Sequence, residues 1–516
     1  MIATNVRRLS FYLLLAFAIV SGGLSWWQVI DAPSLDARQD NPEVIAARRS
    51  MPRGSIFDAN GRLLASSRVS DGLSRRTYED QAFTHLIGYS SLRFGTSGLE
   101  RAWDDILTGR TDPNPLNDVV NDILDRKPTP RDLTLTLDAR LQDFAAAQLG
   151  GDAGAVVALD PRTGAILAIT STPTFDATPI SGDPNEAGEP MERIQDQPGN
   201  PLVDRTRQGH YTPGSIMKVL TAAAALDSGA ITPRTTFREQ PRQETEGFVV
   251  EGFRVREHDL SPVTPALWPL SEALQVSSNI FFAHVGLEVG ADTYLEYARR
   301  FGFCAPLEIG QTSRVLSVAA SFVTAEQDGD CAPFSDRAEL AQASFGQGRV
   351  AVTPMQMALL AATIANDGVR PVPYAVRDVR DHAARPGSGP SERVIETYSP
   401  AGGTRVVSSQ VAGQVRSAMV DAVQGQLGRL YAGAGAVANY GISGVMTAGK
   451  TGTAELGPNT PPHSWFIGFA PAQPNGNPAI AIAVIVESGG SGSGRAAPIG
   501  GAVMAEWLRL QSAAGN

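Results

Sequence analysis

The chain of 516 residues is 42% hydrophobic and 19% charged, a composition that suits roughly three folded domains and excludes intrinsic disorder. Its 43 basic and 53 acidic residues give a formal charge of −10, and the lack of basic runs argues against a nucleic-acid binder. With 2 cysteines, the chain has neither a disulfide scaffold nor a cysteine-rich metal site.

The first predicted element is a membrane-spanning helix over residues 9–30. This stretch has 22 residues and no charged side chain, and about 20 apolar residues suffice to cross a bilayer. Arg7 and Arg8 precede it and Asp31 follows it, so the positive-inside rule places residues 1–8 in the cytoplasm and the rest outside. A cleaved signal peptide is the alternative, but the stretch is long for one and lacks a clear A-x-A site. We therefore expect a single-pass protein of the cytoplasmic membrane.

An extracytoplasmic location would permit a disulfide bond. Cys304 and Cys331 are the one pair that the chain offers. Two unpaired thiols are the alternative, which the sequence leaves open.

Residues 31–130 are predicted as a small N-terminal module with a linker. Asn60-Gly61 indicates a hairpin between two short apolar runs, and residues 99–107 have the pattern of a short helix. Prolines mark the linker, at Pro113, Pro115, Pro128 and Pro130. Such a module would raise a second domain above the membrane and could recruit partners.

Residues 131–516 are predicted as one α+β domain. Residues 132–137 alternate as a strand, Asp138 should cap the helix that follows, and residues 155–159 and 165–170 form a hairpin pattern. Apolar helical patterns follow at residues 217–226, 271–289, 353–365 and 410–423, then strands at 465–470 and 479–486, a Gly/Ser loop at 489–494 and a terminal helix at 498–510. A hairpin early and strands late indicate a sheet closed by both ends of the domain.

Lysine occurs at only three positions, Lys127, Lys218 and Lys450, and the other basic residues are arginine. A GC-rich genome explains the arginines, and a solvated position in the linker explains Lys127. A desolvated lysine can lose its proton and act as a base, whereas arginine stays charged. The positions of Lys218 and Lys450 therefore need a chemical explanation.

Lys218 follows Ser215 by three residues, directly after the chain break at Pro213-Gly214. If Ser215 opens the apolar helix, the two side chains share a face of it. A serine hydroxyl becomes a good nucleophile when a nearby base takes its proton, and a lysine with a depressed pKa can be that base. One S-x-x-K match is a weak signal, but here only three lysines could make it.

Two further short motifs follow along the chain. Ser277-Ser278-Asn279 offers a hydroxyl and an amide that can relay a proton and hold a substrate amide, although alone it could be a helix cap. Lys450 opens Lys-Thr-Gly-Thr, where small Gly452 suits a strand edge against which a substrate backbone lies. The motif is no phosphate-binding loop, because no glycine-rich loop precedes the lysine.

In this order, S-x-x-K, S-x-N and K-T-G are typical of penicillin-binding proteins and class A β-lactamases. The chain resembles a class B penicillin-binding protein, and its similarity covers roughly residues 50–510. Residues 53–58, 60–61 and 154–167 are also similar to segments of this family. Residues 89–93, 99–101 and 460–466 resemble segments of actinobacterial class B members in particular. Ile216-Met217 departs from the family, which often has Thr-Phe there, so we expect altered packing with the chemistry kept.

The resemblance implies a β-lactamase/transpeptidase-like fold, with a five-stranded antiparallel sheet between helices, and a peptidoglycan D,D-transpeptidase without cofactor or metal. Ser215 would attack the penultimate D-Ala of a stem peptide, Lys218 would take its proton, and Ser277 beside Lys450 would protonate the leaving D-Ala. Asn279 would hold the stem-peptide amide. The strand residues Thr451, Gly452 and Thr453 would bind the terminal carboxylate. Its partners would be stem peptides, β-lactams, the membrane and a glycan polymerase or division proteins.

Two alternatives remain at this point. The first is a β-lactamase or D,D-carboxypeptidase on the same scaffold, which the lack of a convincing E-x-x-L-N pattern before Lys450 and the N-terminal module disfavour. The second is an envelope scaffold or β-lactam sensor, which the intact motifs disfavour. The sequence does not distinguish a role in division from one in elongation.

Overall fold

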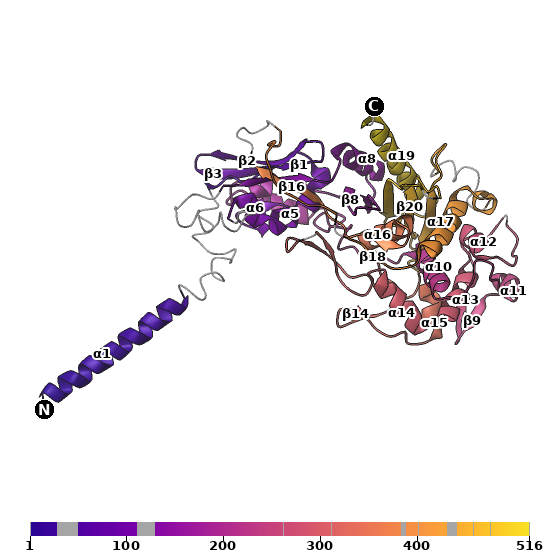
Figure 1. Cartoon of the computed structure of the whole chain (residues 1–516), viewed down its shortest axis with the longest axis horizontal. Coiled ribbons are helices and arrows are strands. Elements are labelled where there is room, and N and C mark those ends of the chain that lie inside the picture. The colour runs from indigo at the N-terminus through magenta and orange to yellow at the C-terminus, as the bar shows by residue number, and fades with distance from the viewer. Residues whose placement is uncertain are drawn as a thin grey trace.

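The computed structural model describes residues 2–27, 50–110, 129–261, 263–310, 312–382, 389–400, 402–430, 441–457, 459–474 and 476–514. Lys127 and most of the predicted proline linker lie outside these residues. Figure 1 shows the body of the molecule as two lobes, one built around strands β1, β2 and β3 and the other around β20.

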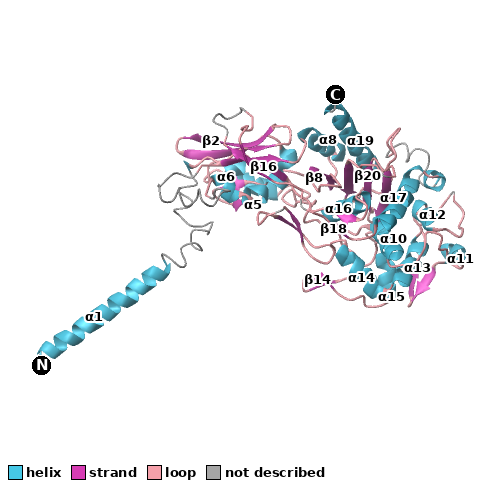
Figure 2. Cartoon of the chain, viewed as in Figure 1, coloured by secondary structure: helices cyan, strands magenta, loops and turns pink. Residues whose placement is uncertain are grey.

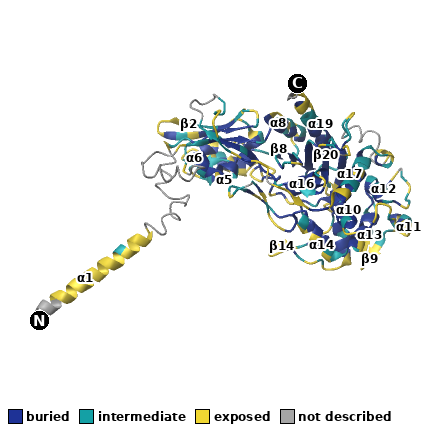
Figure 3. Ribbon diagram, viewed as in Figure 1, coloured by how far each residue is buried: buried dark blue, intermediate teal, exposed yellow. Residues whose placement is uncertain are grey.

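The N-terminal helix α1 spans Ile2–Ser25, and its residues 6–25 are long and apolar enough to cross a membrane. It begins earlier than the predicted span of residues 9–30, whose last three residues lie outside the described part. Its side chains from Val6 onward are almost all exposed, as the yellow ribbon in Figure 3 shows. An exposed apolar helix of this length is what a bilayer would cover.

The N-terminal lobe is built on a six-stranded sheet in the order β17-β16-β6-β1-β2-β3. Its strands are β1 (Ile56–Phe57), β2 (Leu63–Ser70), β3 (Leu73–Tyr78), β6 (Arg131–Leu135), β16 (Val376–Asp381) and β17 (Val394–Thr397). The predicted hairpin at Asn60-Gly61 joins β1 to β2, with Gly61 at φ +86°. β6 pairs in parallel with β1 and antiparallel with β16. Residues 131–516, predicted as one domain, therefore supply three strands to this sheet.

Short elements complete this lobe around a buried ion pair network. They are η2 (Gln81–Phe83), α4 (Thr84–Ile87), β4 (Ser90–Ser91), β5 (Gly95–Thr96), α5 (Gly98–Ala102) and α6 (Asp104–Thr108). The helix predicted over residues 99–107 is thus two helices that meet at Trp103. Fully buried Glu100 accepts hydrogen bonds from Arg53 at 2.7 Å and Arg76 at 2.6 Å. A buried carboxylate between two guanidinium groups is compensated, so the lobe tolerates its burial.

The second lobe contains a five-stranded antiparallel sheet in the order β19-β20-β21-β7-β8, which confirms the predicted fold class. The strands are β7 (Gly154–Leu159), β8 (Ile166–Thr172), β19 (Ala448–Ala454), β20 (His463–Ala470) and β21 (Ile480–Val486). The hairpin β7–β8, the first in residues 131–516, and the chain's last strands meet in one sheet, as the sequence predicted. β19 is an edge strand.

Both faces of this sheet are covered by helices, as Figure 2 shows. α8 (Ala139–Leu149) and α19 (Ala496–Ala514) pack against each other and one face, and α16 (Pro354–Ala365) packs against the other. Successive residues of β21 enter different cores: Ile482 joins the α8/α19 side and Ala483 the opposite side. A strand buried on both faces is apolar throughout, which is why residues 480–486 have no polar alternation.

Helices form most of the rest of this lobe. They are η4 (Gly214–Met217), α10 (Lys218–Asp227), α11 (Gln240–Glu246), α12 (Leu270–Gln275), α13 (Asn279–Val289), α14 (Ala291–Arg300), α15 (Arg337–Ser344) and α17 (Ser409–Gln424). η3 (Pro179–Ser181) instead contacts β3 and β4 of the N-terminal lobe, and α9 (Gly188–Gln195) packs on η3. Two-stranded ribbons join β9 (Phe248–Val250) to β10 (Phe253–Val255), β11 (Leu307–Ile309) to β12 (Leu316–Val318), β13 (Glu326–Gln327) to β14 (Asp330–Cys331), and β15 (Val369–Arg370) to β18 (Thr404–Arg405).

Two predicted helices have different bounds in the structure. The apolar pattern over residues 271–289 is two helices, α12 and α13, because Ser277 takes a left-handed backbone conformation with φ 58°. The helix predicted to open at Ser215 begins as the 3-10 turn η4, and α10 starts only at Lys218. Both differences fall on the short motifs.

Candidate active site

The candidate site lies where three segments meet: the edge strand β19, the turn η4 before α10, and the turn between α12 and α13. Gly214 brings η4 against β19, since a Cβ there would lie only 2.8 Å from the carbonyl oxygen of Thr453. Gly214 also has φ +60°, which favours glycine. Ser215 is therefore placed directly beside the Lys-Thr-Gly-Thr strand.

Aromatic side chains hold the segment before Ser215 from behind. Trp465 on β20 donates its indole N–H to the Thr212 carbonyl at 3.0 Å. The Tyr211 ring packs edge-on against Trp465 and His463, and its hydroxyl donates to Glu487 at 2.7 Å. His463, the first residue of β20, thus lies in this supporting layer.

Lys218 is fully buried, and its nitrogen reaches two of these segments, η4 and the turn between α12 and α13. Lys218 Nζ lies 2.9 Å from Ser215 Oγ, 2.5 Å from the Ser277 carbonyl oxygen and 2.7 Å from Asn279 Oδ1. Residues of two motifs that are distant in the sequence are thus brought around one amine.

These contacts match the donors and acceptors of a neutral amine. The Ser277 carbonyl and the Asn279 amide oxygen can only accept, so Lys218 donates to both. A neutral amine then has one lone pair left, and the third contact is to the Ser215 hydroxyl, which has a proton to give. The geometry therefore suits transfer of the hydroxyl proton from Ser215 to Lys218.

Lys450 reaches the same group of residues from β19. Its nitrogen donates to Ser277 Oγ at 2.8 Å and to the Thr451 carbonyl at 3.1 Å, and its side chain is buried. Ser277 Oγ also lies 3.3 Å from Lys218 Nζ. The Ser277 hydroxyl thus bridges the two lysines, and a proton can pass along this path.

Burial changes the protonation of both lysines. It lowers the pKa of Lys218 to about 7, with the charge of Glu257 acting in the opposite direction. It also lowers the pKa of Lys450, and the charge of Lys218 lowers it further. Because two ammonium groups beside one hydroxyl repel each other in a buried site, the pair carries fewer than two positive charges near neutral pH.

Both the backbone and the side chain of Asn279 are held by Arg256 and Glu257, which the sequence analysis did not single out. Its Nδ2 donates to the Arg256 carbonyl at 3.2 Å, which leaves Oδ1 to face Lys218, and its backbone N–H donates to Glu257 Oε1 at 2.9 Å. No motif marks Glu257, since only the fold brings it to the start of α13. Glu257 lies too far before Asn279 in the sequence for the two residues to form a recognisable motif.

A cleft beside β19 has a volume of about 210 Å³ and includes Lys450, Thr451 and Thr453 in its lining. Asp259 and two serines of the Gly/Ser loop, Ser491 and Ser493, complete its polar wall. Gly452 has no room for a side chain, because a Cβ there would lie 2.7 Å from the Pro213 carbonyl oxygen. Of the predicted substrate-binding residues, Thr451 and Thr453 therefore border this open space beside Lys450, whereas Gly452 packs against Pro213.

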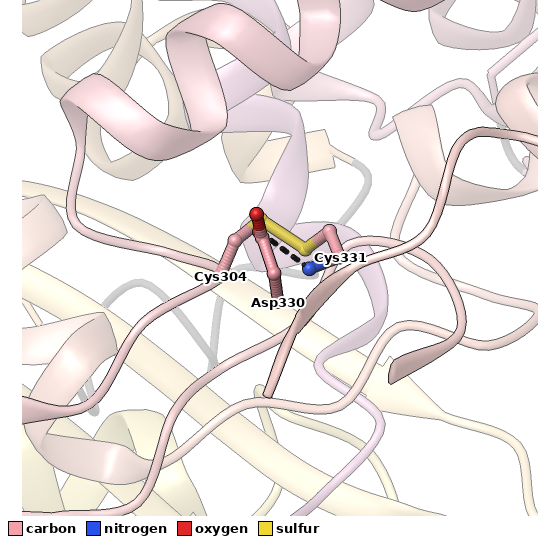
Figure 4. Close-up of side chains that lie close together, drawn as sticks. All are labelled: Cys304, Asp330 and Cys331. Atoms are coloured by element: carbon pink, nitrogen blue, oxygen red, sulfur yellow. Dashed lines mark hydrogen bonds between the residues drawn. A yellow bond between two sulfur atoms is a disulfide. The ribbon is translucent and has the colours of Figure 1, made fainter. Parts of the chain in front are cut away.

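The two cysteines lie in a different part of the second lobe. Cys304 follows α14 and Cys331 ends β14, and their sulfurs are bonded, with S–S 2.07 Å. Figure 4 shows Asp330 beside them, accepting a hydrogen bond from the Cys331 backbone N–H at 2.6 Å. These three residues could be mistaken for a metal site, but bonded sulfurs are not thiolate ligands.

Comparison with known proteins agrees with this geometry. A family model described as the penicillin binding protein transpeptidase domain matches residues 154–505, and one described as the penicillin binding protein A dimerisation domain matches residues 53–132. The chain is 36% identical to the peptidoglycan D,D-transpeptidase PbpA of Mycolicibacterium smegmatis, over 98% of this chain and 99% of that protein.

Solved structures give the same result. The ceftriaxone acyl-enzyme complex of penicillin-binding protein A from M. tuberculosis matches with a TM-score of 0.75 and 34% identity, covering 90% of this chain and 100% of that one. The D,D-transpeptidase domain of a peptidoglycan glycosyltransferase from Eggerthella lenta matches with a TM-score of 0.71 and 29% identity, also covering 90% and 100%.

Proposed function

Because this chain belongs to the class B penicillin-binding proteins, we propose how its own residues carry out the reaction of that family. The protein is a serine-type peptidoglycan D,D-transpeptidase that binds penicillin covalently and works in cell-wall synthesis. The observation that supports the assignment of residues is the contact of Lys218 Nζ with Ser215, Ser277 and Asn279.

In the proposed acylation, Ser215 Oγ attacks the carbonyl carbon of the penultimate D-Ala and gives its proton to Lys218. The tetrahedral oxyanion is held by the backbone N–H groups of Ser215 and Thr453, each such donor lowering the barrier by ~3–4 kcal/mol. The C–N bond then breaks, and the departing amine of the terminal D-Ala takes this proton from Lys218 through the Ser277 hydroxyl, which leaves Lys218 neutral again. An ester between Ser215 and the stem peptide remains.

The substrate carboxylate would set the protonation of the two lysines. We place it beside Lys450, Thr451 and Thr453, in the cleft next to β19. A carboxylate there favours the charged form of Lys450. Repulsion from that charge then keeps Lys218 neutral, which is the form that can act as a base.

In the second half of the reaction, the amine of a neighbouring stem peptide attacks the ester carbonyl. The amine gives a proton to Lys218 as the new amide bond forms, the ester bond breaks, and Ser215 Oγ takes that proton from Lys218. Asn279 would hold an amide of the donor peptide throughout. A β-lactam enters the first half-reaction in the same way and acylates Ser215.

The nucleophile can be tested with the full-length chain in detergent and a fluorescent penicillin. Ser215→Ala should form no covalent adduct, because it removes the hydroxyl that lies 2.9 Å from Lys218 Nζ, and Ser277 Oγ is farther from this amine, at 3.3 Å. Ser417→Ala, at an exposed position of α17, is the matched control and should be labelled normally. A labelled Ser215→Ala protein would contradict the assignment.

The base can be tested with Lys218→Arg. A guanidinium stays protonated at every relevant pH, so acylation should fall by about 10²-fold or more. Stopped-flow labelling at pH 7.5 measures the rate, and a thermal melt confirms folding. A rate near that of the natural protein would contradict the role of Lys218.

We further propose that α1 anchors the protein with residues 1–8 inside and the body outside. The charge distribution around the helix supports this orientation. An epitope added after residue 516 should be accessible to antibody on intact protoplasts, whereas one added before Met1 should not.

Residues 31–130 with strand β6 would form a pedestal that recruits a glycan polymerase or division proteins.

A further inference from the structure

We infer that Glu257 is a positioning residue for acylation: its carboxylate fixes the turn that carries Ser277 and Asn279 and stabilises the charge of the base Lys218. This inference rests on the proposed role of Lys218. Arg256 and Glu257 follow the β9–β10 ribbon and reach the start of α13 from outside all three short motifs.

The contacts of Glu257 are those of an ionised carboxylate. Its side chain is 2% exposed, and it accepts from the backbone N–H groups of Asn279 at 2.9 Å and Ile280 at 3.1 Å. These are among the first N–H groups of α13, which have no partner within the helix. A carboxylate at a helix N-terminus is favoured by the helix dipole as well as by these bonds.

Two carboxylates meet at the Ser278 hydroxyl, the N-cap of α13. Ser278 Oγ lies 2.9 Å from Glu257 Oε2 and 3.0 Å from Glu244 Oε1. Burial raises the pKa of Glu244, and its Oε2 is buried with no hydrogen-bond partner among the described residues. Burial thus favours the neutral form of Glu244, whereas the backbone N–H groups from which Glu257 accepts favour its negative charge.

That charge remains on Glu257 although burial opposes it. Burial alone would raise the pKa of Glu257, but hydrogen bonds and charges from His258, Lys218 and the Asn279 N–H outweigh it and the pKa is lowered. His258 Nδ1 lies 2.9 Å from Glu257 Oε1. Among the described residues, the charged or titratable groups around this site include Glu244, His258, Lys218 and Lys450, and Asp259 lines the cleft beside Lys450.

Glu257 reaches the base through Asn279. The backbone N–H of Asn279 is bound to Glu257 while its side-chain oxygen accepts from Lys218 at 2.7 Å. The neighbouring residue Ser277 has a left-handed backbone, φ 58°, a conformation that persists only where the surroundings hold it. Loss of the carboxylate would therefore loosen the turn and remove a negative charge near Lys218.

The test is the rate of acylation by a fluorescent penicillin between pH 5.5 and 9.5, with the full-length chain in detergent. In Glu257→Gln, the amide can accept with one oxygen only, so the maximal rate should fall about tenfold or more. The acidic midpoint of the profile should move to lower pH by about one unit, since a negative charge no longer favours protonated Lys218. Glu288→Gln, an exposed position near the other end of α13, should change neither value.

The Glu257→Asp variant distinguishes the effect of the carboxylate charge from the effect of side-chain length. It should keep the acidic midpoint of the natural protein and lower the maximal rate, because the charge stays while the carboxylate is one methylene shorter. A midpoint that moves in Glu257→Asp, or one that stays in Glu257→Gln, overturns the inference. So does a maximal rate that neither substitution lowers, and Glu257→Asp decides alone if Glu257→Gln fails to fold. If the natural protein has no acidic limb, the role of Lys218 fails instead.

Discussion

Among single residues, Ser277 combines a chemical group with a strained backbone. Its φ of 58° costs a non-glycine residue about 1 kcal/mol or more. Ser277→Gly and Ser277→Ala both remove the hydroxyl that bridges the lysines, so both should lose acylation. Only glycine relieves the backbone, so Ser277→Gly should unfold with a free energy ~1 kcal/mol higher than Ser277→Ala in urea.

The same pair of substitutions at Ser417 gives the control for this comparison. Ser417 is exposed within α17, where glycine is less favourable than alanine by ~1 kcal/mol. The order of stabilities should therefore reverse between the two positions. Equal stabilities for Ser277→Gly and Ser277→Ala would show that the left-handed turn stores no strain.

The sequence motifs predicted which residues the fold brings together, but they did not predict the protonation states of those residues in the folded site. Ser215 and Lys218 could be paired from their spacing, and the scarcity of lysine drew attention to Lys450. The bridge through Ser277 and the support from Glu257 depend on tertiary contacts that no spacing encodes. Protonation in a buried site follows from such contacts, which is why the sequence alone could not give it.

Among the secondary structure elements, the cap of α8 is a prediction of the sequence that stability measurements can test. Asp138 accepts from the Arg140 N–H at 2.9 Å, and its second oxygen accepts from Asn60 Nδ2 at 3.0 Å. Asp138→Ala should lower the free energy of unfolding by about 1–2 kcal/mol in urea, whereas Asp138→Asn keeps a cap acceptor and should cost less. Equal losses in the two variants would contradict a capping role.

The difference between natural protein and Asp138→Asn should also depend on pH. Burial alone would raise the pKa of Asp138, but hydrogen bonds from Arg140 and Asn60 lower it. A folded-state pKa below the unfolded value gives stability above about pH 4 that is lost as the pH falls further. Urea unfolding at pH 7 and pH 3.5 checks this, and a pH-independent difference would argue against an ionised cap.

Long periodic elements were predicted well and the motif elements were not. The sequence located α16, α17, β20 and β21 to within a few residues, because burial on one or two faces imposes an apolar pattern. It extended one helix through residues 276–278, since the break lies in the backbone of Ser277 and apolar residues continue on both sides. Strain at an active site overrides local pattern.

At the level of the whole molecule, the shared six-stranded sheet predicts that the lobes cannot be separated by one cut. A fragment of residues 131–516 would lose β1, and with it the parallel partner of β6 and the cover of buried Leu133 and Leu135. We expect this fragment to aggregate and to bind fluorescent penicillin poorly, whereas residues 50–516 should remain soluble and be labelled. A soluble shorter fragment with the same melting temperature would contradict this expectation.

The sequence also could not predict which strands belong to which lobe. β16 lies in the middle of the chain's catalytic half, yet it pairs with β6 and, through Tyr374, with the turn between β7 and β8, where Tyr374 N–H donates to Gly164 at 3.1 Å. Strand pairing over such separations leaves no local pattern. At this scale, the sequence predicted the fold class, the sheet closed by both ends of residues 131–516 and the presence of an N-terminal module.

The origin of that sheet in three segments has a consequence for synthesis. β1, β2, β3 and β6 leave the ribosome early, but β16 and β17 follow only after most of the catalytic helices. The N-terminal lobe therefore has an open strand edge while the later half of the chain is made, instead of folding first as N-terminal domains usually do. Such an edge is a template for mispairing, so a chaperone that shields it during synthesis would matter most for this lobe.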